Sequence, residues 1–313
     1  MLRQKIVSEL DRIYADALDN FLASRLITDV VRVVKSGKEA TVFCCQAHPS
    51  TEVELLAAKI YRRGQFHHVV TKKRDSFREV TFFDHTRFSN FKNDAVYREG
   101  RIIDKRLRRA SQKRTRKARE VEHVSWIEQE FETLSLLYNA GADVPRPFAQ
   151  SETAILMEYI GDEQSPAPLL RDVILAPEEV EPLFELLFEN IRIWLACNRV
   201  HADLSPYNIL YWDGVLKIID FPQSVDPRVN RNAYTLLQRD IKNICRYWAR
   251  YGIRRDALEL ANDLYECWLH RVGIPNPLHD DNSPPNPNAT GLSFQRVHRA
   301  MFPIGAIFPD IFG

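Results

Sequence analysis

The chain has 313 residues, 45% of them hydrophobic, and its 43 Lys and Arg nearly balance its 42 Asp and Glu, for a net charge of +1. That length and apolar content suffice for a folded core, and five cysteines without a C-x-x-C pair indicate neither a disulfide framework nor a structural zinc site. No apolar run approaches the roughly 18 residues of a membrane span, so we expect a reduced, cytoplasmic protein that does not associate with a membrane.

The first half of the chain predicts a helical start followed by a small sheet. Apolar residues at helical spacing within residues 3–25 indicate a leading helix or pair of helices. Three β-like runs separated by short turns then favour an antiparallel meander. These runs are residues 29–34, 41–47 and 53–61. A helix at 121–140 and two strands at 147–150 and 153–160 complete this half.

The second half is predicted to be mainly helical, with one hairpin. Helices are expected at residues 178–198, 234–251 and 256–271. Two short strands at 209–212 and 215–219 flank Asp213-Gly214, a dipeptide typical of a two-residue hairpin turn. A Pro- and Asn-rich stretch at 275–288 indicates an irregular loop.

One stretch of the chain carries most of the positive charge. Residues 98–119, which begin at Arg98 and end at Arg119, hold eleven Lys and Arg against two acidic residues, a local charge of +9. A polyanion would therefore be attracted to one site and not to the surface generally. Either the segment is a solvated loop or it binds RNA phosphates, which makes affinity salt-dependent. Ser111 and Thr115 within it are candidate autophosphorylation sites.

The most specific motif is His-Ala-Asp-Leu-Ser-Pro-Tyr-Asn, from His201 to Asn208, which is followed by Asp220 after the run Leu-Lys-Ile-Ile. Transfer of a γ-phosphoryl group needs a carboxylate that orients the acceptor hydroxyl and a metal that offsets the phosphate charge. We predict that Asp203 is the catalytic base and that Asn208 and Asp220 bind Mg²⁺ or Mn²⁺, since hard cations prefer oxygen ligands. Each residue taken alone would be read as a turn or cap residue.

Lys59, in Leu-Leu-Ala-Ala-Lys-Ile-Tyr, resembles the strand lysine of kinases that contacts the α- and β-phosphates of ATP and pairs with a glutamate of the next helix. We therefore count Lys59 and Asp220 among the catalytic residues. The predicted partner is Glu130, in Glu-Phe-Glu-Thr-Leu, although Glu128 lies half a turn away and could replace it. The alternative is an exposed lysine on an alternating strand.

A turn between the first two predicted strands contains Ser36, Gly37 and Lys38, followed by Glu-Ala-Thr-Val. A glycine lets backbone N–H groups approach a phosphate closely, so these three residues are predicted to bind the nucleotide. The turn is not a Walker A loop, because G-x-x-x-x-G-K-[ST] is absent.

Six segments follow one another in this order over about residues 30 to 250: Ser-Gly-Lys-Glu-Ala-Thr-Val, Ala-Lys-Ile-Tyr, Trp-Ile-Glu-Gln-Glu-Phe-Glu-Thr-Leu, Leu-Met-Glu-Tyr-Ile-Gly, His-Ala-Asp-Leu-Ser-Pro-Tyr-Asn and Ile-Asp-Phe-Pro-Gln-Ser-Val. Together they resemble the RIO kinase family. Ile-Asp-Phe-Pro-Gln in place of Asp-Phe-Gly is characteristic of that family. No winged helix is recognisable before residue 30, so the chain resembles the branch without that module, and its segment between Lys59 and Glu130 is unusually long.

This resemblance implies an α+β, two-lobed protein-kinase-like fold in a trimmed form, with a small antiparallel-sheet N-lobe carrying one main helix and a mostly helical C-lobe. The expected divisions are a helical extension at 1–28, an N-lobe at 29–160 with a basic insertion at 74–120, a C-lobe at 161–273, and a Pro- and Asn-rich loop and tail at 274–313.

The resemblance also implies a set of ligands and partners. ATP would lie in the cleft between the lobes, with its adenine against the backbone of Glu158 and Ile160. The substrate would be a protein, including the chain itself, and some family members resemble ATPases that phosphorylate their own metal-binding aspartate, here Asp220. Because the family is linked to small-ribosomal-subunit maturation, the segment 98–119 is expected to reach RNA or a ribosomal particle.

Two other functions compete with this one. Small-molecule phosphotransferases of the aminoglycoside or choline kinase type share H-x-D-x-x-x-x-N and a following Ile-Asp, but they lack the Ser-Gly-Lys-Glu-Ala turn and the Phe-Pro-Gln after Asp220. A non-catalytic RNA-binding scaffold with a kinase shape is the third possibility. The intact Asp203, Asn208, Asp220 and Lys59 argue against it.

Overall fold

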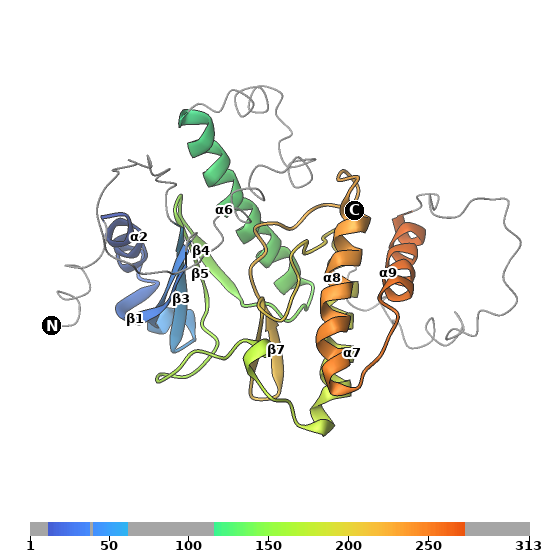
Figure 1. The fold of residues 1–313 in the computed structure, drawn as a ribbon. Coiled ribbons are helices and arrows are strands. Elements are labelled where there is room, and N and C mark those ends of the chain that lie inside the picture. The colour runs from blue at the N-terminus through green and yellow to red at the C-terminus, as the bar shows by residue number, and fades with distance from the viewer. Residues whose placement is uncertain (1–11, 38–39, 62–115, 273–313) are drawn as a thin grey trace, which may run out of the picture. The chain divides into compact units, whose positions relative to one another are not determined.

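Five strands form one antiparallel sheet in the computed structural model, which describes residues 12–37, 40–61 and 116–272 (Figure 1). The strands are β1 (Ile27–Ser36), β2 (Ala40–Ala47), β3 (Leu55–Tyr61), β4 (Pro147–Gln150) and β5 (Ala154–Glu158). Their order in the sheet is β1-β2-β3-β5-β4, and every neighbouring pair is antiparallel. The middle strand is therefore β3, which explains why its sequence is nearly all apolar.

Two helices cover opposite faces of this sheet (Figure 1). Helix α2 (Arg12–Ala23) packs Tyr14, Leu18 and Phe21 into a cluster that includes Ala58 and Ile60 of β3. Side chains alternate between the faces of a strand, so the intervening Lys59 points to the other face. There it meets α6 (Arg116–Asn139), the main helix of this part of the chain.

The remaining described residues form a mostly helical part with one hairpin. Its elements are α7 (Pro177–Ala196), β6 (Ile209–Trp212), β7 (Val215–Ile218), α8 (Ala233–Trp248) and α9 (Ala257–Val272). Short 3-10 helices occur at η1 (Pro49–Thr51), η2 (Leu170–Asp172) and η3 (Ala249–Tyr251). Trp194 of α7 and Trp248 of α8 are almost completely buried, and Phe184 packs edge-on against Trp248. Large aromatic side chains thus fill this second core.

The hairpin turn between β6 and β7 has the conformation that its sequence predicts. Asp213 and Gly214 both have positive φ, at 48° and 77°, as a two-residue turn with matching twist requires. The strands pair from Ile209 with Ile218 to Trp212 with Val215. Because this hairpin joins the segment of Asp203 to that of Asp220, its short turn fixes how the two segments approach each other.

The predicted α+β fold, with a small antiparallel sheet, one main helix and a mostly helical second lobe, is confirmed. Helix α6 begins at Arg116, five residues earlier than predicted, so the last four residues of the basic segment are helical. Strand β3 begins two residues later than predicted, because the connection first forms η1. The predicted start of the leading helix, most of the insertion at 74–120 and the tail at 274–313 lie outside the described residues.

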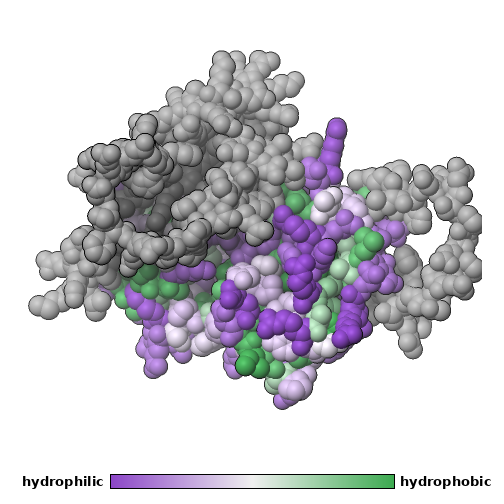
Figure 2. Space-filling model, viewed as in Figure 1, coloured by the Kyte–Doolittle hydropathy of each residue, from purple (hydrophilic) through white to green (hydrophobic). Residues whose placement is uncertain are grey.

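Contacts group residues 1–268 into one compact unit and residues 269–313 into a second, of which only the end of α9 is described. Hydrophilic residues make up most of the described surface seen in Figure 2, with hydrophobic residues scattered among them. Within the described ranges, no helix combines the length and the apolar character needed to cross a membrane.

Candidate active site

One lysine connects three separate parts of the chain. The Lys59 Nζ of β3 donates to Glu130 Oε1 of α6 at 2.7 Å and to Asp220 Oδ1, beyond β7, at 2.8 Å. The Glu130 side chain is 1% exposed, whereas that of Asp220 is 43% exposed. The structure therefore brings these three predicted residues together, and it pairs Lys59 with Glu130, while Glu128 is exposed.

Burial and charge oppose each other in this cluster. Burial would lower the pKa of Lys59, but the carboxylates of Asp220 and Glu130 outweigh it and raise that pKa well above its ordinary value. Burial would raise the pKa of Asp220, but the neighbouring Lys59 ammonium lowers it. Burial dominates at Glu130 and raises its pKa. A protonated lysine and an ionised Asp220 are thus the stable forms near neutral pH.

Tyr61 is a member of this cluster that the sequence motifs did not reveal. Its hydroxyl donates to Glu130 Oε2, and the Lys59 Nζ lies 5.1 Å from the centre of its ring. Burial, followed by the Glu130 carboxylate, raises the pKa of Tyr61 well above its ordinary value, so it remains a donor. The available signal was its position two residues after Lys59, since alternate residues of a strand share a face.

The loop from His201 to Asn208 is closed by its own asparagine. The Asn208 Nδ2 donates to the Asp203 carbonyl at 2.9 Å and lies 3.4 Å from Asp203 Oδ2. The Asn208 carbonyl accepts the Ile219 N–H at 2.9 Å, one residue before Asp220. The predicted base and both predicted metal ligands are therefore held by one set of bonds across two loops.

A buried aspartate of α8 accepts hydrogen bonds from the backbone of this loop. Asp240 is 1% exposed and accepts the backbone N–H groups of Ala202 at 2.8 Å and Leu204 at 3.1 Å. Ala202 has a φ of 64°, a left-handed conformation that costs free energy in a residue other than glycine. The two bonds hold the loop in that conformation. Sequence reasoning missed Asp240, because nothing in the chain marks a contact over nearly forty residues.

The imidazole of His201 links the two loops as well. Its Nδ1 accepts the Asp203 N–H at 3.3 Å, and its Nε2 lies 3.2 Å from the Ile219 carbonyl, to which it can donate only when it carries the proton. The ring packs against Phe221 and Trp194. Both bonds are satisfied by the neutral imidazole with its proton on Nε2.

The predicted phosphate turn follows β1. Ser36 is exposed, and its Oγ lies 3.3 Å from Thr41 Oγ1 across the turn. The Gly37 N–H donates to the Ala40 carbonyl at 2.9 Å, and a Cβ on Gly37 would meet that carbonyl oxygen at 3.3 Å. Lys38 lies outside the described residues.

The predicted adenine-binding backbone follows β5. The Glu158 N–H donates to the Arg146 carbonyl at 2.7 Å, and the Ile160 carbonyl accepts the Ala167 N–H at 2.9 Å. These two bonds use the N–H of Glu158 and the carbonyl of Ile160, the two residues whose backbone is predicted to contact adenine. Gly161 then turns the chain at a φ of 135°, where a Cβ would come within 2.5 Å of a backbone oxygen.

The oxygen atoms of the predicted metal ligands suit a metal ion that is also coordinated by the phosphates of a nucleotide. Asn208 and Asp220, the two predicted metal ligands, offer amide and carboxylate oxygens, and the Asn208 Nδ2 is already bonded, so its Oδ1 is the atom left to bind a cation. Among the residues that the structure describes, no group of three or more His, Cys, Asp and Glu side chains could hold a metal alone. Mg²⁺ is usually bound through one or two carboxylates together with substrate phosphates.

The buried His201 predicts a pH dependence of stability. Burial lowers the pKa of His201 to about 4, below the roughly 6.5 of an exposed histidine. Between these values the unfolded chain binds a proton that the folded chain does not, so stability falls as the pH falls. From pH 7 to pH 5 we expect a loss of about 2 kcal/mol from this residue. Chemical denaturation of the wild type and His201→Gln at both pH values measures it, and the same pH dependence in both proteins would contradict the assignment.

Comparison with known proteins identifies the family. The family model described as RIO domain matches residues 65–260, which contain Glu130, Asp203, Asn208 and Asp220. The match begins after Lys59 and the phosphate turn. It covers more than half of the chain.

Curated relatives carry the same family name. The serine/threonine-protein kinase RIO1 of Chaetomium thermophilum is 30% identical over 245 residues, which are 75% of this chain and 42% of that protein. The RIO-type serine/threonine-protein kinase Rio1 of Thermoplasma acidophilum is 35% identical over 131 residues, which are 42% of this chain and 67% of that protein. The chain spans less than half the length of several curated relatives that it matches.

A solved structure supports the fold. The Rio2 kinase–ADP/Mg²⁺–phosphoaspartate complex from Chaetomium thermophilum aligns with a TM-score of 0.50 and 23% identity, over 82% of this chain and 70% of that one. The shared architecture, the family match over residues 65–260 and the relatives agree, and the chain belongs to the RIO family.

Proposed function

We propose that this chain is a RIO-type, ATP-dependent serine/threonine protein kinase or ATPase that transfers the γ-phosphoryl group of ATP with Mg²⁺. The observation that carries the proposal is the Lys59 ammonium held between the buried Glu130 and the half-exposed Asp220, beside a loop that bonds to the Asp220 segment. The relatives named as serine/threonine-protein kinases support it.

The nucleotide would be bound by a lysine side chain, by the turn after β1 and by the backbone that follows β5. Lys59 would contact the α- and β-phosphates, and it is oriented for this by the Glu130 carboxylate. The backbone of Ser36, Gly37 and Lys38 would cover the phosphates. The Glu158 carbonyl and the Ile160 N–H would hold the adenine.

Asn208 and Asp220 would hold the metal. When bound, Mg²⁺ offsets the negative charge that develops on the phosphates. Asp220 is suited to this, because its carboxylate is ionised by the Lys59 ammonium and is partly open to solvent. The Asn208 side chain is fixed by its bond to the Asp203 carbonyl, so its Oδ1 has a defined position.

Asp203 would orient the acceptor. Its carboxylate would accept the proton of the attacking hydroxyl as the new oxygen–phosphorus bond forms, while the bond from the γ-phosphorus to ADP breaks and ADP leaves. A serine or threonine hydroxyl as acceptor gives a phosphoprotein, and water gives free phosphate. The Asp220 carboxylate is a further acceptor, since a RIO-family relative was solved as a phosphoaspartate complex.

A small-molecule phosphotransferase is not favoured. The matching family and its named relatives are RIO-type protein kinases. The chemistry of Asp203 and Asp220 would be common to both classes, so the family match and not the catalytic loop distinguishes them.

The partners follow from the same proposal. A protein would be the substrate, including the chain itself at Ser111 or Thr115. RNA or a ribosomal particle would bind the basic segment at 98–119, which carries a charge of +9. A cytoplasmic location is supported by the five cysteines, all of which are free thiols.

Labelled ATP tests the proposal. Purified protein with Mg²⁺ and γ-labelled ATP is followed for free phosphate, acid-stable phosphoprotein and hydroxylamine-labile phosphate. Asp203→Ala should lower turnover at least about 100-fold while ATP affinity stays near the wild-type value, because a base acts on the acceptor. Asp220→Ala should also weaken Mg²⁺-dependent ATP binding.

The matched control for both variants is Asp213→Asn, because Asp213 is an exposed acidic residue in the β6–β7 turn. It should behave as wild type. Equal ATP affinity of the wild type and Asp220→Ala in saturating Mg²⁺, measured by calorimetry, would contradict the metal-binding role. Undiminished turnover of Asp203→Ala would contradict the base.

The basic segment predicts a salt-dependent RNA affinity. Changing six of its residues to Gln should flatten the slope of log affinity against log salt by up to about 4, since each phosphate contact to a single strand contributes roughly 0.7. The six residues are Arg106, Arg108, Arg109, Arg114, Arg116 and Lys117. Basal ATP hydrolysis should survive. A control with the exposed Lys242, Arg246 and Arg254 changed to Gln should keep the slope, and an unchanged slope in the six-residue variant would rule out the RNA contact.

A further inference from the structure

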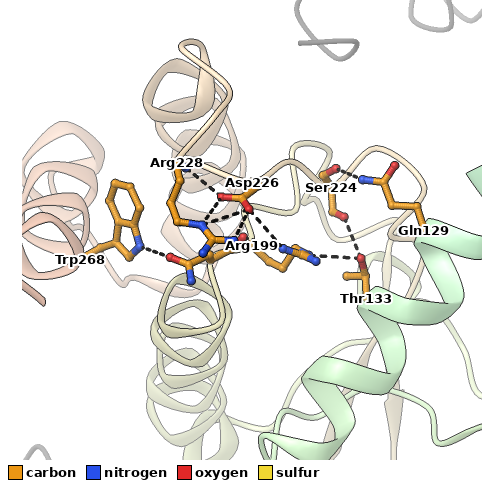
Figure 3. A network of polar contacts seen from close by, with 8 residues as sticks. Gln129, Thr133, Arg199, Ser224, Asp226, Arg228 and Trp268 are labelled. Carbon is orange, nitrogen blue, oxygen red and sulfur yellow. Dashed lines mark hydrogen bonds and ion pairs between the residues drawn. The ribbon is translucent and has the colours of Figure 1, made fainter. Parts of the chain in front are cut away.

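Helix α6 makes a second set of contacts one turn beyond the glutamate that pairs with the strand lysine. Thr133 lies three residues after Glu130, so the two side chains are neighbours on the helix surface. Both are buried, with Thr133 0% exposed. Figure 3 shows Thr133 and Gln129 reaching from α6 toward the segment that contains Ser224.

Three polar contacts join α6 to the segments that contain Arg199 and Ser224. Thr133 Oγ1 lies 3.4 Å from the Oγ of the buried Ser224, and Arg199 Nε donates to the same Thr133 oxygen at 3.4 Å (Figure 3). Gln129 Nε2 adds a bond to the Ser224 carbonyl at 3.3 Å. We call Thr133, Arg199 and Ser224 the polar clamp.

The arginine of the polar clamp is itself held in place. Its NH1 lies 3.9 Å from Asp226 Oδ2, and that carboxylate receives three bonds from the Arg228 guanidinium, the shortest at 2.6 Å. The Arg199 NH1 also donates to the carbonyl of Asn198, whose side chain accepts the indole N–H of Trp268 on α9. The guanidinium therefore has little freedom to turn away from α6.

The polar clamp joins α6 to both catalytic loops at once. Arg199 stands four residues before Asp203, and Ser224 stands four residues after Asp220. The next residue of each segment, Val200 and Val225, forms an antiparallel bridge with the other through two backbone bonds of 3.0 and 2.9 Å. The two loops therefore share one support, and α6 is bonded to that support.

We propose that Thr133, Arg199 and Ser224 are positioning residues, which hold α6 in the place that brings its glutamate to the strand lysine. This inference rests on the proposed function, because it concerns the same site. The contacts that join α6 to Ser224 and Arg199 are all longer than 3.2 Å, whereas the bond from Lys59 to Glu130 is 2.7 Å. Without the polar clamp, α6 would be held mainly by the ion pair between Lys59 and Glu130 and by the packing of its buried apolar side chains.

The test uses a variant that keeps volume and removes the hydroxyl, Thr133→Val. With Glu130 displaced, the Lys59 amine should react faster with an N-hydroxysuccinimide acetate reagent, by about fivefold in peptide mass spectrometry. Thr133→Ser, which keeps the hydroxyl, should label at close to the wild-type rate. The matched control is Ser135→Ala, which removes a hydroxyl that, among the residues the structure describes, is bonded within α6, to the Phe131 carbonyl.

A kinetic arm links the polar clamp to the reaction. Thr133→Val should lower kcat/KM for ATP about tenfold in the wild-type background and less than about twofold in the Glu130→Gln background, because the effect is transmitted through that glutamate. A role in packing alone would give the same loss in both backgrounds. Ser135→Ala should leave kcat/KM unchanged.

Two results would overturn the positioning role of the polar clamp. One is an unchanged labelling rate of Lys59 in Thr133→Val, and the other is an equal loss of kcat/KM in the wild-type and Glu130→Gln backgrounds. If Thr133→Val fails to fold by circular dichroism, Ser224→Ala takes its place in both arms, since it removes the other hydroxyl. A wild-type chain that turns over no ATP would overturn the proposed function instead, and the labelling rates would still decide the polar clamp.

Discussion

The ammonium group of Lys59 lies between two carboxylates that differ greatly in their access to solvent. The Glu130 side chain is 1% exposed and the Asp220 side chain 43% exposed, so one carboxylate is committed to the lysine while the other can also reach a ligand. Removing one member of a buried ion pair leaves an uncompensated charge, which is strongly destabilising. The sheet, helix α6 and the segment after β7 must therefore meet at this point, and the rest of the fold holds these three parts together.

The two loops that contain Asp203 and Asp220 are held in place by hydrogen bonds to both side chains and backbone. Ala202 and Asp220 have φ values of 64° and 73°, which cost free energy outside glycine. Two amide bonds to Asp240, the imidazole of His201 and the bond between the Asn208 carbonyl and the Ile219 N–H fix these conformations. The side chains of Asp203, Asn208 and Asp220 are consequently in place before a nucleotide arrives, as the proposed catalysis would require.

Local patterns in the sequence predicted the strands, the Asp213-Gly214 turn and the loop motif, because each depends on residues close together in the chain. They favoured Glu130 as the partner of Lys59 but did not exclude Glu128. The apolar residues Ile127, Leu134 and Leu137 line the buried face of α6, and Glu130 lies on that face. Tyr61, Asp240 and the contacts between Thr133 and Arg199 were missed, since these depend on how distant segments meet. The roles of the predicted residues remain proposals, whereas the fold and the family are established by the comparisons.

The most direct test of the account is the position of the metal. Crystals of the chain with a non-hydrolysable ATP analogue and Mn²⁺ would give an anomalous signal that locates the ion. We predict an ion bonded to Asp220 and Asn208 at roughly 2.1 Å, with a phosphate oxygen of the analogue within hydrogen-bonding reach of the Lys59 ammonium. A nucleotide bound with its phosphates away from Lys59, or an ion that touches neither Asp220 nor Asn208, would contradict it.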